Sequence, residues 1–171
     1  YREQQQSGTA QDWVPRLKLA NGKWFDQTGT IAFIDNRVDP RTGVVEAMIS
    51  DFVQPNGLAF SPDETTLYVA ESGSSHDPDV PSVIRAFDLD DAGRITGDRV
   101  FATIDKGLPD GMRVDADGRG WSSAADGIHC FDTDGTRLGK ILVPEVVANL
   151  CFGGPRGNRL YITATTSVYT I

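Results

Sequence analysis

Short runs of apolar and polar residues fill the chain from about position 50 onward, and turn-forming residues separate them. The runs are about four to six residues long, and clusters of Gly, Asp and Pro recur roughly every eight to twelve residues, which is typical of an all-β sandwich, barrel or propeller. No helical periodicity of useful length appears. The pattern therefore predicts an all-β fold of short antiparallel strands.

Three segments of the chain repeat one spacing. Each begins with a small polar residue, Asn56, Asp110 or Asn149, and in each a second strand begins eleven positions later. A radial array of such units gathers equivalent positions around one axis. The repeat therefore predicts that these three residues lie at equivalent points and contribute to a shared site.

Four strands per unit at this length select the propeller among the all-β folds. The third unit stops one strand short, and a blade needs about 40–45 residues, so we expect a partial propeller of about three to three and a half blades. The expected strands cover residues 57–60, 66–70, 83–88 and 99–103, then 111–114, 120–124, 127–131 and 138–142, and finally 150–152, 160–164 and 168–171.

The blades define the expected domain organisation. Residues 1–30 form an N-terminal segment without a clear pattern, and the propeller covers residues 31–171. Within it we expect outer strands of a blade at 31–50, a blade at 51–104, a blade at 105–143 and an incomplete last blade at 144–171.

Composition narrows the classes of function. The 171 residues are 39% hydrophobic and carry a net charge of −8, which argues against nucleic-acid binding, since such surfaces are basic. No run reaches the roughly 18 apolar residues of a membrane span, and the first ten residues lack the order of a signal peptide. We therefore expect neither a nucleic acid nor a membrane as partner, and a cytoplasmic location.

The cysteines and histidines carry little chemistry in this pattern. Cys130 and Cys151 have no CxxC spacing, so we expect two free, buried thiols. His129 is expected to be a partly exposed strand residue, and His76 a solvated residue of a long polar loop. The acidic clusters at 88–91 and 132–135 do not complete a calcium loop and indicate outer turns. The aromatic residues expected between blades are Phe60, Phe101, Trp121, Phe131 and Phe152.

Three tripeptides occur in a specific order: Pro-Asn-Gly ending at Gly57, Pro-Asp-Gly ending at Gly111, and Phe-Gly-Gly ending at Gly154. Together with the strand segments 67–70 and 160–164, they resemble the second half of the gluconolactonase family, which includes senescence marker protein and luciferin-regenerating enzyme. The resemblance covers residues 34–171.

The resemblance implies a six-bladed β-propeller with a divalent metal at the top of its central channel and hydrolysis of sugar lactones. It makes Asn56 a metal ligand, and Asp110 both a metal ligand and the general base, while Asn149 lines the channel without a firm role. Calcium is the preferred cofactor and zinc the alternative. The family's glutamate ligand and a further asparagine have no counterpart here, so the chain resembles the C-terminal half.

These residue types suit the chemistry. Lactone hydrolysis needs an activated water and a stabilised oxyanion, and one metal can supply both. Calcium prefers oxygen ligands, which a carboxylate and an amide provide. Gly57 and Gly111, which follow Asn56 and Asp110, permit close backbone approach where inner strands converge.

A second hypothesis is a non-catalytic half-propeller used for binding or assembly. Half a ring exposes apolar blade faces, and two copies can pair to make six blades. Under the first hypothesis the partner is a small-molecule lactone. Under the second it is another copy of the chain.

Overall fold

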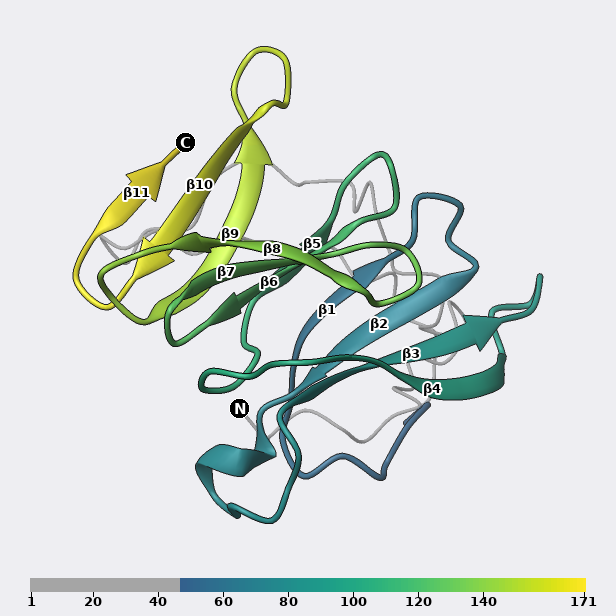
Figure 1. Ribbon diagram of the computed structural model, residues 1–171. Helices are drawn as coiled ribbons and strands as arrows, with labels where there is room; N and C mark the ends of the chain where they lie inside the picture. The colour runs from purple at the N-terminus through teal and green to yellow at the C-terminus, as the bar shows by residue number, and fades with distance from the viewer. Residues whose placement is uncertain (1–46) are drawn as a thin grey trace, which may run out of the picture. The chain divides into compact units, whose positions relative to one another are not determined.

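Eleven strands and one short 3-10 helix make up residues 47–171, the part of the chain that this computed structural model describes (Figure 1). The first sheet contains β1 (Pro55–Phe60), β2 (Thr66–Glu71), β3 (Val83–Leu89) and β4 (Ile95–Thr103), with η1 (Gly73–Ser75) between β2 and β3. The second contains β5 (Met112–Val114), β6 (Gly120–Ala124), β7 (Gly127–Phe131) and β8 (Arg137–Leu142). The third contains β9 (Val147–Gly153), β10 (Arg159–Ala164) and β11 (Val168–Thr170).

Every pairing in these sheets is antiparallel, and each strand lies beside its neighbour in the sequence. The predicted all-β class is therefore confirmed. No helix in residues 47–171 is long and apolar enough to cross a membrane.

Strand boundaries follow the hydrophobic pattern closely, and the two largest differences lie at the starts of β4 and β9. β6 and β7 cover the predicted residues, whereas β4 begins at Ile95 rather than near position 99. The register places Asp98 opposite Phe87, so cross-strand pairing extends β4 through a polar stretch. β9 likewise begins at Val147 rather than at position 150.

The predictions for the start of the chain fall mostly outside the described residues. The N-terminal segment 1–30 and the strand expected at 31–38 lie there, as does most of the strand expected at 44–49. Residues 47–49, the described end of that strand, do not lie in a strand.

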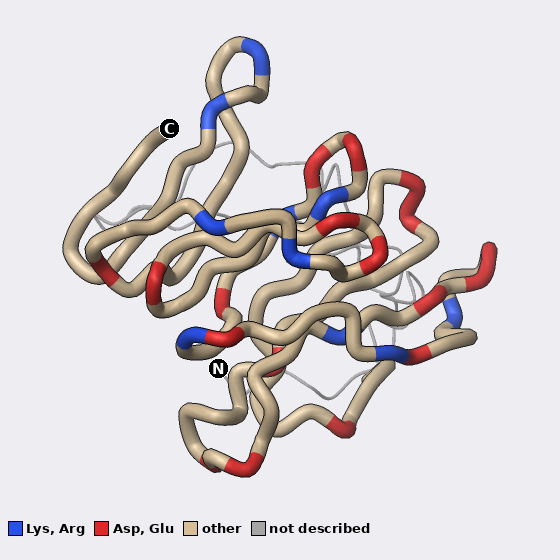
Figure 2. The backbone as a smooth tube through the Cα atoms, viewed as in Figure 1, with Lys and Arg blue, Asp and Glu red and all other residues tan. Residues whose placement is uncertain are grey.

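The strand-connecting turns are closed by aspartate side chains. Asp115 Oδ1 accepts hydrogen bonds from the backbone N–H groups of Asp117 and Arg119, at 3.0 and 2.9 Å. Asp90 Oδ1 accepts in the same way from Ala92 and Arg94, at 3.0 and 2.8 Å. A short side-chain acceptor satisfies the backbone of a tight turn, so these aspartates act as turn formers. Figure 2 shows the acidic positions mainly in the turns and loops.

The second sheet lies between the first and the third (Figure 1), and a hydrophobic cluster fills each interface. In the cluster between the first and second sheets, the Phe101 and Phe131 rings lie 6.2 Å apart. In the cluster between the second and third sheets, Trp121 meets Phe152 edge-on at 5.8 Å. Aromatic pairs in this geometry contribute about 0.5–1.5 kcal/mol beyond the area they bury.

Phe60 does not join these interfaces. It is 44% exposed near the end of β1, so its expected position between blades is wrong for the described structure. Alternation explains the difference: in the register with β2, Ala59 and Phe60 point to opposite faces, and Ala59 packs against the first cluster.

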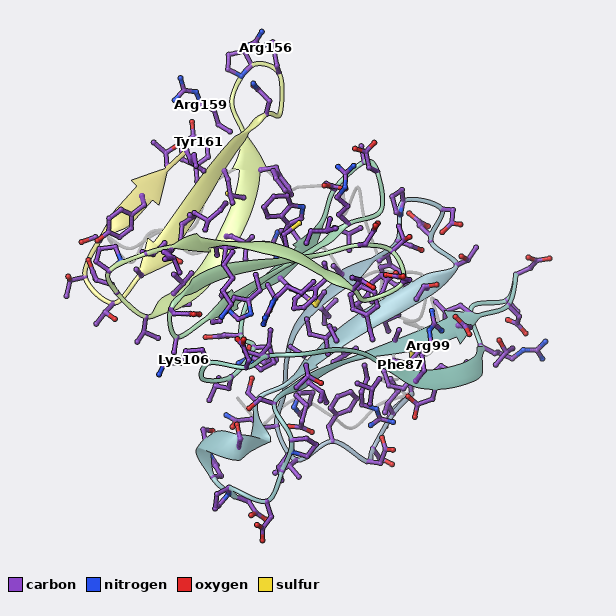
Figure 3. All side chains as sticks on the ribbon, viewed as in Figure 1. Phe87, Arg99, Lys106, Arg156, Arg159 and Tyr161 are labelled. Carbon is purple, nitrogen blue, oxygen red and sulfur yellow. The ribbon has the colours of Figure 1, made fainter. Side chains whose placement is uncertain are left out.

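A third cluster covers the other face of the first sheet. Phe87, labelled in Figure 3, packs there and is 2% exposed. The Arg85 guanidinium lies over the Phe52 and Phe87 rings, 4.6 and 4.9 Å from their centroids, and forms a two-pronged ion pair with Asp51. This arrangement fixes residues 51–52, which precede β1, on the face of the first sheet that lies opposite the first cluster.

Candidate functional site

Asn56 and Asp110 lie together where the first sheet meets the second. Asn56 is at the start of β1, and Asp110 comes two residues before β5. The Asn56 side-chain amide lies near enough to the Asp110 carboxylate to favour its ionised form. The backbones also join, because the Gly57 N–H donates to the Asp110 carbonyl oxygen at 2.9 Å. Asn56 and Asp110, 54 positions apart in the sequence, are thus brought side by side.

Gly57 is what allows this approach. A Cβ at this position would lie 2.0 Å from the Asp110 carbonyl oxygen and 3.0 Å from the Met112 nitrogen. No side chain fits there without moving one strand away from the other. The glycine predicted to permit close approach does so between β1 and the segment that carries Asp110.

Asn149 lies one sheet further along, on β9. The Gly111 N–H donates to the Ala148 carbonyl oxygen at 2.8 Å, and a Cβ on Gly111 would lie 2.3 Å from Asn149 Oδ1. That oxygen accepts the Leu150 N–H at 2.8 Å. Asn149 thus touches the residue after Asp110, while its amide oxygen is engaged by its own strand.

A hollow of about 210 Å³ opens beside Asn149. Its walls are formed by Arg113, Asn149, Leu150, Cys151, Tyr161 and Thr163. Cys151 is exposed, so its predicted burial is wrong: the buried side chains of β9 are Val147 and Leu150, and Cys151 lines this hollow. Cys130 on β7 is free and buried, as predicted.

The electrostatics of the pair centre on Asp110. Burial raises the pKa of the Asp110 carboxyl above its ordinary value, and the hydrogen bond from Asn56 acts against this rise. Neither of these influences is a positive charge. The ionised carboxylate therefore lacks a cationic partner within the described residues.

The donor set at this point fits a hard divalent cation. A carboxylate and an amide oxygen from adjacent strands are ligands that Ca²⁺ accepts. A cation there would compensate the charge that burial leaves costly. Zinc sites in proteins draw mainly on Cys and His, and neither type is within the Asn56–Asp110 contact.

A second polar cluster lies elsewhere, between the loop after β4 and the second sheet. It consists of Asp105, Asp126 and His129, whose potential ligand atoms lie within 4.8 Å of one another. The Lys140 ammonium donates to Asp105 at 2.7 Å and to Asp126 at 2.9 Å, and so occupies the place a cation would take. Hydrogen bonds from Lys140 and then Arg137 lower the pKa of Asp105 to about 2. This cluster is therefore an internally balanced ion-pair network.

His129 belongs to that network and corrects a prediction. Its side chain is fully buried rather than partly exposed, and its Nε2 lies 2.8 Å from Asp126 Oδ1. β7 is covered on both faces because the second sheet lies between two others, so alternation does not bring every second side chain to solvent. His76 is exposed at the end of η1, as predicted, with Nδ1 2.9 Å from Ser75 Oγ.

The sequence analysis did not predict two residues that contact the segments leading into Asn56 and Asp110. Glu71 and Ser72, at the end of β2, are buried and form hydrogen bonds to the segments before Asn56 and Asp110. A charged residue directly after a run of buried strand residues was the available signal, because such a residue is rarely buried without partners.

Residues 32–166 match the family described as the SMP-30/Gluconolactonase/LRE-like region. The gluconolactonase of Zymomonas mobilis subsp. mobilis is 38% identical over 143 residues, which cover 78% of this chain and 38% of that protein. A solved gluconolactonase from Xanthomonas campestris is 41% identical with a TM-score of 0.63, over 71% of this chain and 38% of the other.

A solved calcium-binding protein, regucalcin from Agrobacterium tumefaciens strain C58, is 30% identical with a TM-score of 0.62. The match covers 73% of this chain and 42% of that one. The chain thus spans between 38% and 42% of the length of these relatives.

Proposed function

The chain belongs to the SMP-30/gluconolactonase/LRE-like family, and we propose that it acts in the metal-dependent hydrolysis of sugar lactones. The observation that carries the proposal is the close approach of Asn56 and Asp110, two oxygen-bearing side chains whose segments are joined by the Gly57 N–H and the Asp110 carbonyl oxygen. Relatives named gluconolactonase, and a structural neighbour named a calcium-binding protein, support this chemistry.

We propose that the three sheets are blades of a six-bladed β-propeller. The blades would cover residues 51–104, 105–143 and 144–171, the last lacking its outer strand. The order of strands in each sheet and the placing of the second sheet between its neighbours support this arrangement. Asn56, Asp110 and Asn149 would then line the central channel at equivalent positions.

In this proposal Asn56 and Asp110 hold a divalent metal, with calcium preferred over zinc because both ligands are oxygens. Bound there, the ion would supply Lewis-acid polarisation of the lactone carbonyl and a lowered pKa for water. Asn149 would line the channel beside Asp110 and present its side chain to the substrate.

Asp110 is the proposed general base. Burial raises the pKa of its carboxyl, which makes the carboxylate a stronger base than an exposed aspartate, while the neighbouring Asn56 amide favours the ionised form. The carboxylate takes a proton from water while the water oxygen bonds to the lactone carbonyl carbon. The ring C–O bond then breaks, and the ring oxygen takes the proton from the Asp110 carboxyl and becomes the hydroxyl of the hydroxy acid, which restores the Asp110 carboxylate.

The test is Asp110→Asn in the complete natural polypeptide, assayed with glucono-lactone. Loss of a general base typically costs about 10²–10⁴-fold in rate, so kcat/KM should fall at least about 100-fold. Asp117→Asn is the matched control, since Asp117 is exposed in a turn and pairs with Arg119. Hydrolysis by Asp110→Asn at the wild-type rate would remove Asp110 from the mechanism.

A second candidate function is assembly, which the exposed apolar side chains favour. Leu58, Leu142, Val168 and Ile171 are between 59% and 74% exposed. Side chains of this kind suit contact with another protein surface. Sedimentation of the purified chain discriminates: a strict monomer rules out self-association, whereas calcium binding in calorimetry favours the hydrolase.

A further inference from the structure

Two consecutive polar residues, Glu71 and Ser72, are buried where β2 ends. They are 5% and 1% exposed, respectively. Burying a carboxylate and a hydroxyl costs free energy unless each is hydrogen-bonded. Their partners therefore show what this pair does in the molecule.

Glu71 binds the segment that leads into Asn56. Its carboxylate accepts the N–H groups of Val53 at 2.9 Å, Gln54 at 2.8 Å and Gly73 at 2.7 Å. Three backbone donors satisfy a buried carboxylate without a cation. Two of these donors lie two and three residues before Asn56, so Glu71 fixes the entry to β1.

Ser72 forms hydrogen bonds to the segments that precede both Asn56 and Asp110. Its N–H donates to the Gln54 carbonyl oxygen at 3.0 Å, and its hydroxyl donates to the Pro109 carbonyl oxygen at 2.5 Å. Pro109 is buried and directly precedes Asp110. The dipeptide Glu71–Ser72 thus joins the residue two positions before Asn56 to the residue directly before Asp110.

The sheet itself does not fix Asn56, which is why such a connection matters. The pairing of β1 with β2 is regular from Leu58 onward but shifts between Pro55 and Leu58. Asn56 and Gly57 lie inside this irregular stretch, and Pro55 has no N–H to donate. Hydrogen bonds outside the ladder must therefore hold Asn56 in register with Asp110.

The neighbouring sheet repeats the arrangement. The Ser123 hydroxyl, buried on β6, donates to the Ala148 carbonyl oxygen at 3.2 Å, and Ala148 directly precedes Asn149. In both cases a buried serine, Ser72 directly after β2 or Ser123 on β6, donates to the carbonyl of the residue before a candidate site residue.

We propose that Glu71 and Ser72 are positioning residues that set the distance between Asn56 and Asp110, and so the affinity of their site for a divalent cation. This inference rests on the proposed function for the identity of the bound ion. The connection between the two strands rests on the hydrogen bonds alone.

The experiment compares Ser72→Ala, Ser72→Thr and Ser122→Ala in the complete natural polypeptide. Ser122 is a matched control, because it is equally buried but its hydroxyl donates only to the adjacent Ser123 carbonyl. Calcium affinity is measured by calorimetry, and exchange of the Gly57 amide proton by NMR in calcium-free solution. The Gly57 amide is informative because its acceptor is the Asp110 carbonyl.

One net hydrogen bond corresponds to roughly a 2- to 10-fold change in an equilibrium constant. Ser72→Ala should therefore weaken calcium binding about 5-fold to 10-fold and speed Gly57 exchange several-fold, with a thermal midpoint similar to that of Ser122→Ala. Ser72→Thr, which keeps the hydroxyl, should restore most of both.

The two ideas fail in different ways. Asp110→Asn with unchanged calcium affinity would overturn the proposed metal site, and Gly57 exchange would then decide on the positioning role. Gly57 exchange in Ser72→Ala that equals exchange in Ser122→Ala overturns the positioning role, whatever the metal does. Calcium affinity lost equally in both serine variants also overturns it, because the loss then reflects general destabilisation.

Discussion

Replacing Gly57 with alanine should move β1 away from the segment that carries Asp110, and the structure gives the size of this displacement. The added Cβ would lie 2.0 Å from the Asp110 carbonyl oxygen, whereas real Cβ contacts are essentially never shorter than 3.0 Å. The strand and the Asp110 segment must therefore move apart by about 1 Å or more. That displacement stretches the 2.9 Å hydrogen bond from the Gly57 N–H to the same oxygen.

Two terms set the loss of stability. Overpacking in a well-packed region costs about 1–3 kcal/mol, and the weakened hydrogen bond adds about 1 kcal/mol. Gly57→Ala should therefore destabilise the fold by about 2–4 kcal/mol. Because Asn56 precedes the displaced residue, activity should fall more steeply, since about 1 Å of misplacement can cost about 100-fold in rate.

Gly139→Ala is the control, because no atom lies within 4 Å of a Cβ at that position on β8. It should leave stability within about 0.5 kcal/mol of wild type, as surface substitutions usually do. Urea unfolding and lactone hydrolysis are measured for both variants in the complete natural polypeptide. Gly57→Ala that unfolds at the same urea concentration as Gly139→Ala would refute the steric argument.

Three further outcomes are expected. Hydrogen bonds from Lys140 and Arg137 lower the pKa of Asp105 to about 2. The Asp105 carboxylate therefore stabilises the fold above about pH 4, and this stabilisation is lost as the pH falls through 2. The thermal midpoints of wild type and Asp105→Asn should differ at pH 5 and converge near pH 2. Burial raises the pKa of Asp110, so its ionisation opposes folding as the pH rises above about 4. Without added metal, the thermal midpoint of Asp110→Asn should exceed that of wild type at pH 7 and equal it at pH 3. Glu145 accepts the Thr166 N–H at 2.7 Å and the Tyr169 hydroxyl at 2.6 Å; Glu145→Gln should speed amide exchange in β11 and leave β6 and β7 unchanged.

The sequence pattern predicted strands well where the alternation of residues is short-range and strict. β6 and β7 are bounded by Gly and Asp turns, and their limits were predicted without error. The equivalence of Asn56 and Asp110 was also visible, because a repeated spacing carries three-dimensional information when units pack side by side. In the structure the two residues lie side by side.

The sequence pattern did not predict features that depend on how the sheets pack against one another. His129 occupies an alternating strand, yet it is fully buried because β7 is covered on both faces. Cys151 has an apolar context, yet it is exposed on β9. Whether a strand has one covered face or two depends on which sheets flank it, and local alternation does not record that.

Glu71 shows why residues that position a site are harder to predict from sequence than the site residues themselves. Asn56 and Asp110 stand out because each belongs to a repeated tripeptide, but Glu71 and Ser72 act through backbone atoms of Val53, Gln54 and Pro109. Backbone N–H and C=O groups are the same at every position, so no side-chain motif marks their partners. A buried charged residue at a strand end is therefore the signal to follow, because its cost of burial requires donors nearby. In this chain those donors lie in the segment leading into one of the two proposed ligands, and the serine beside the charge reaches the other.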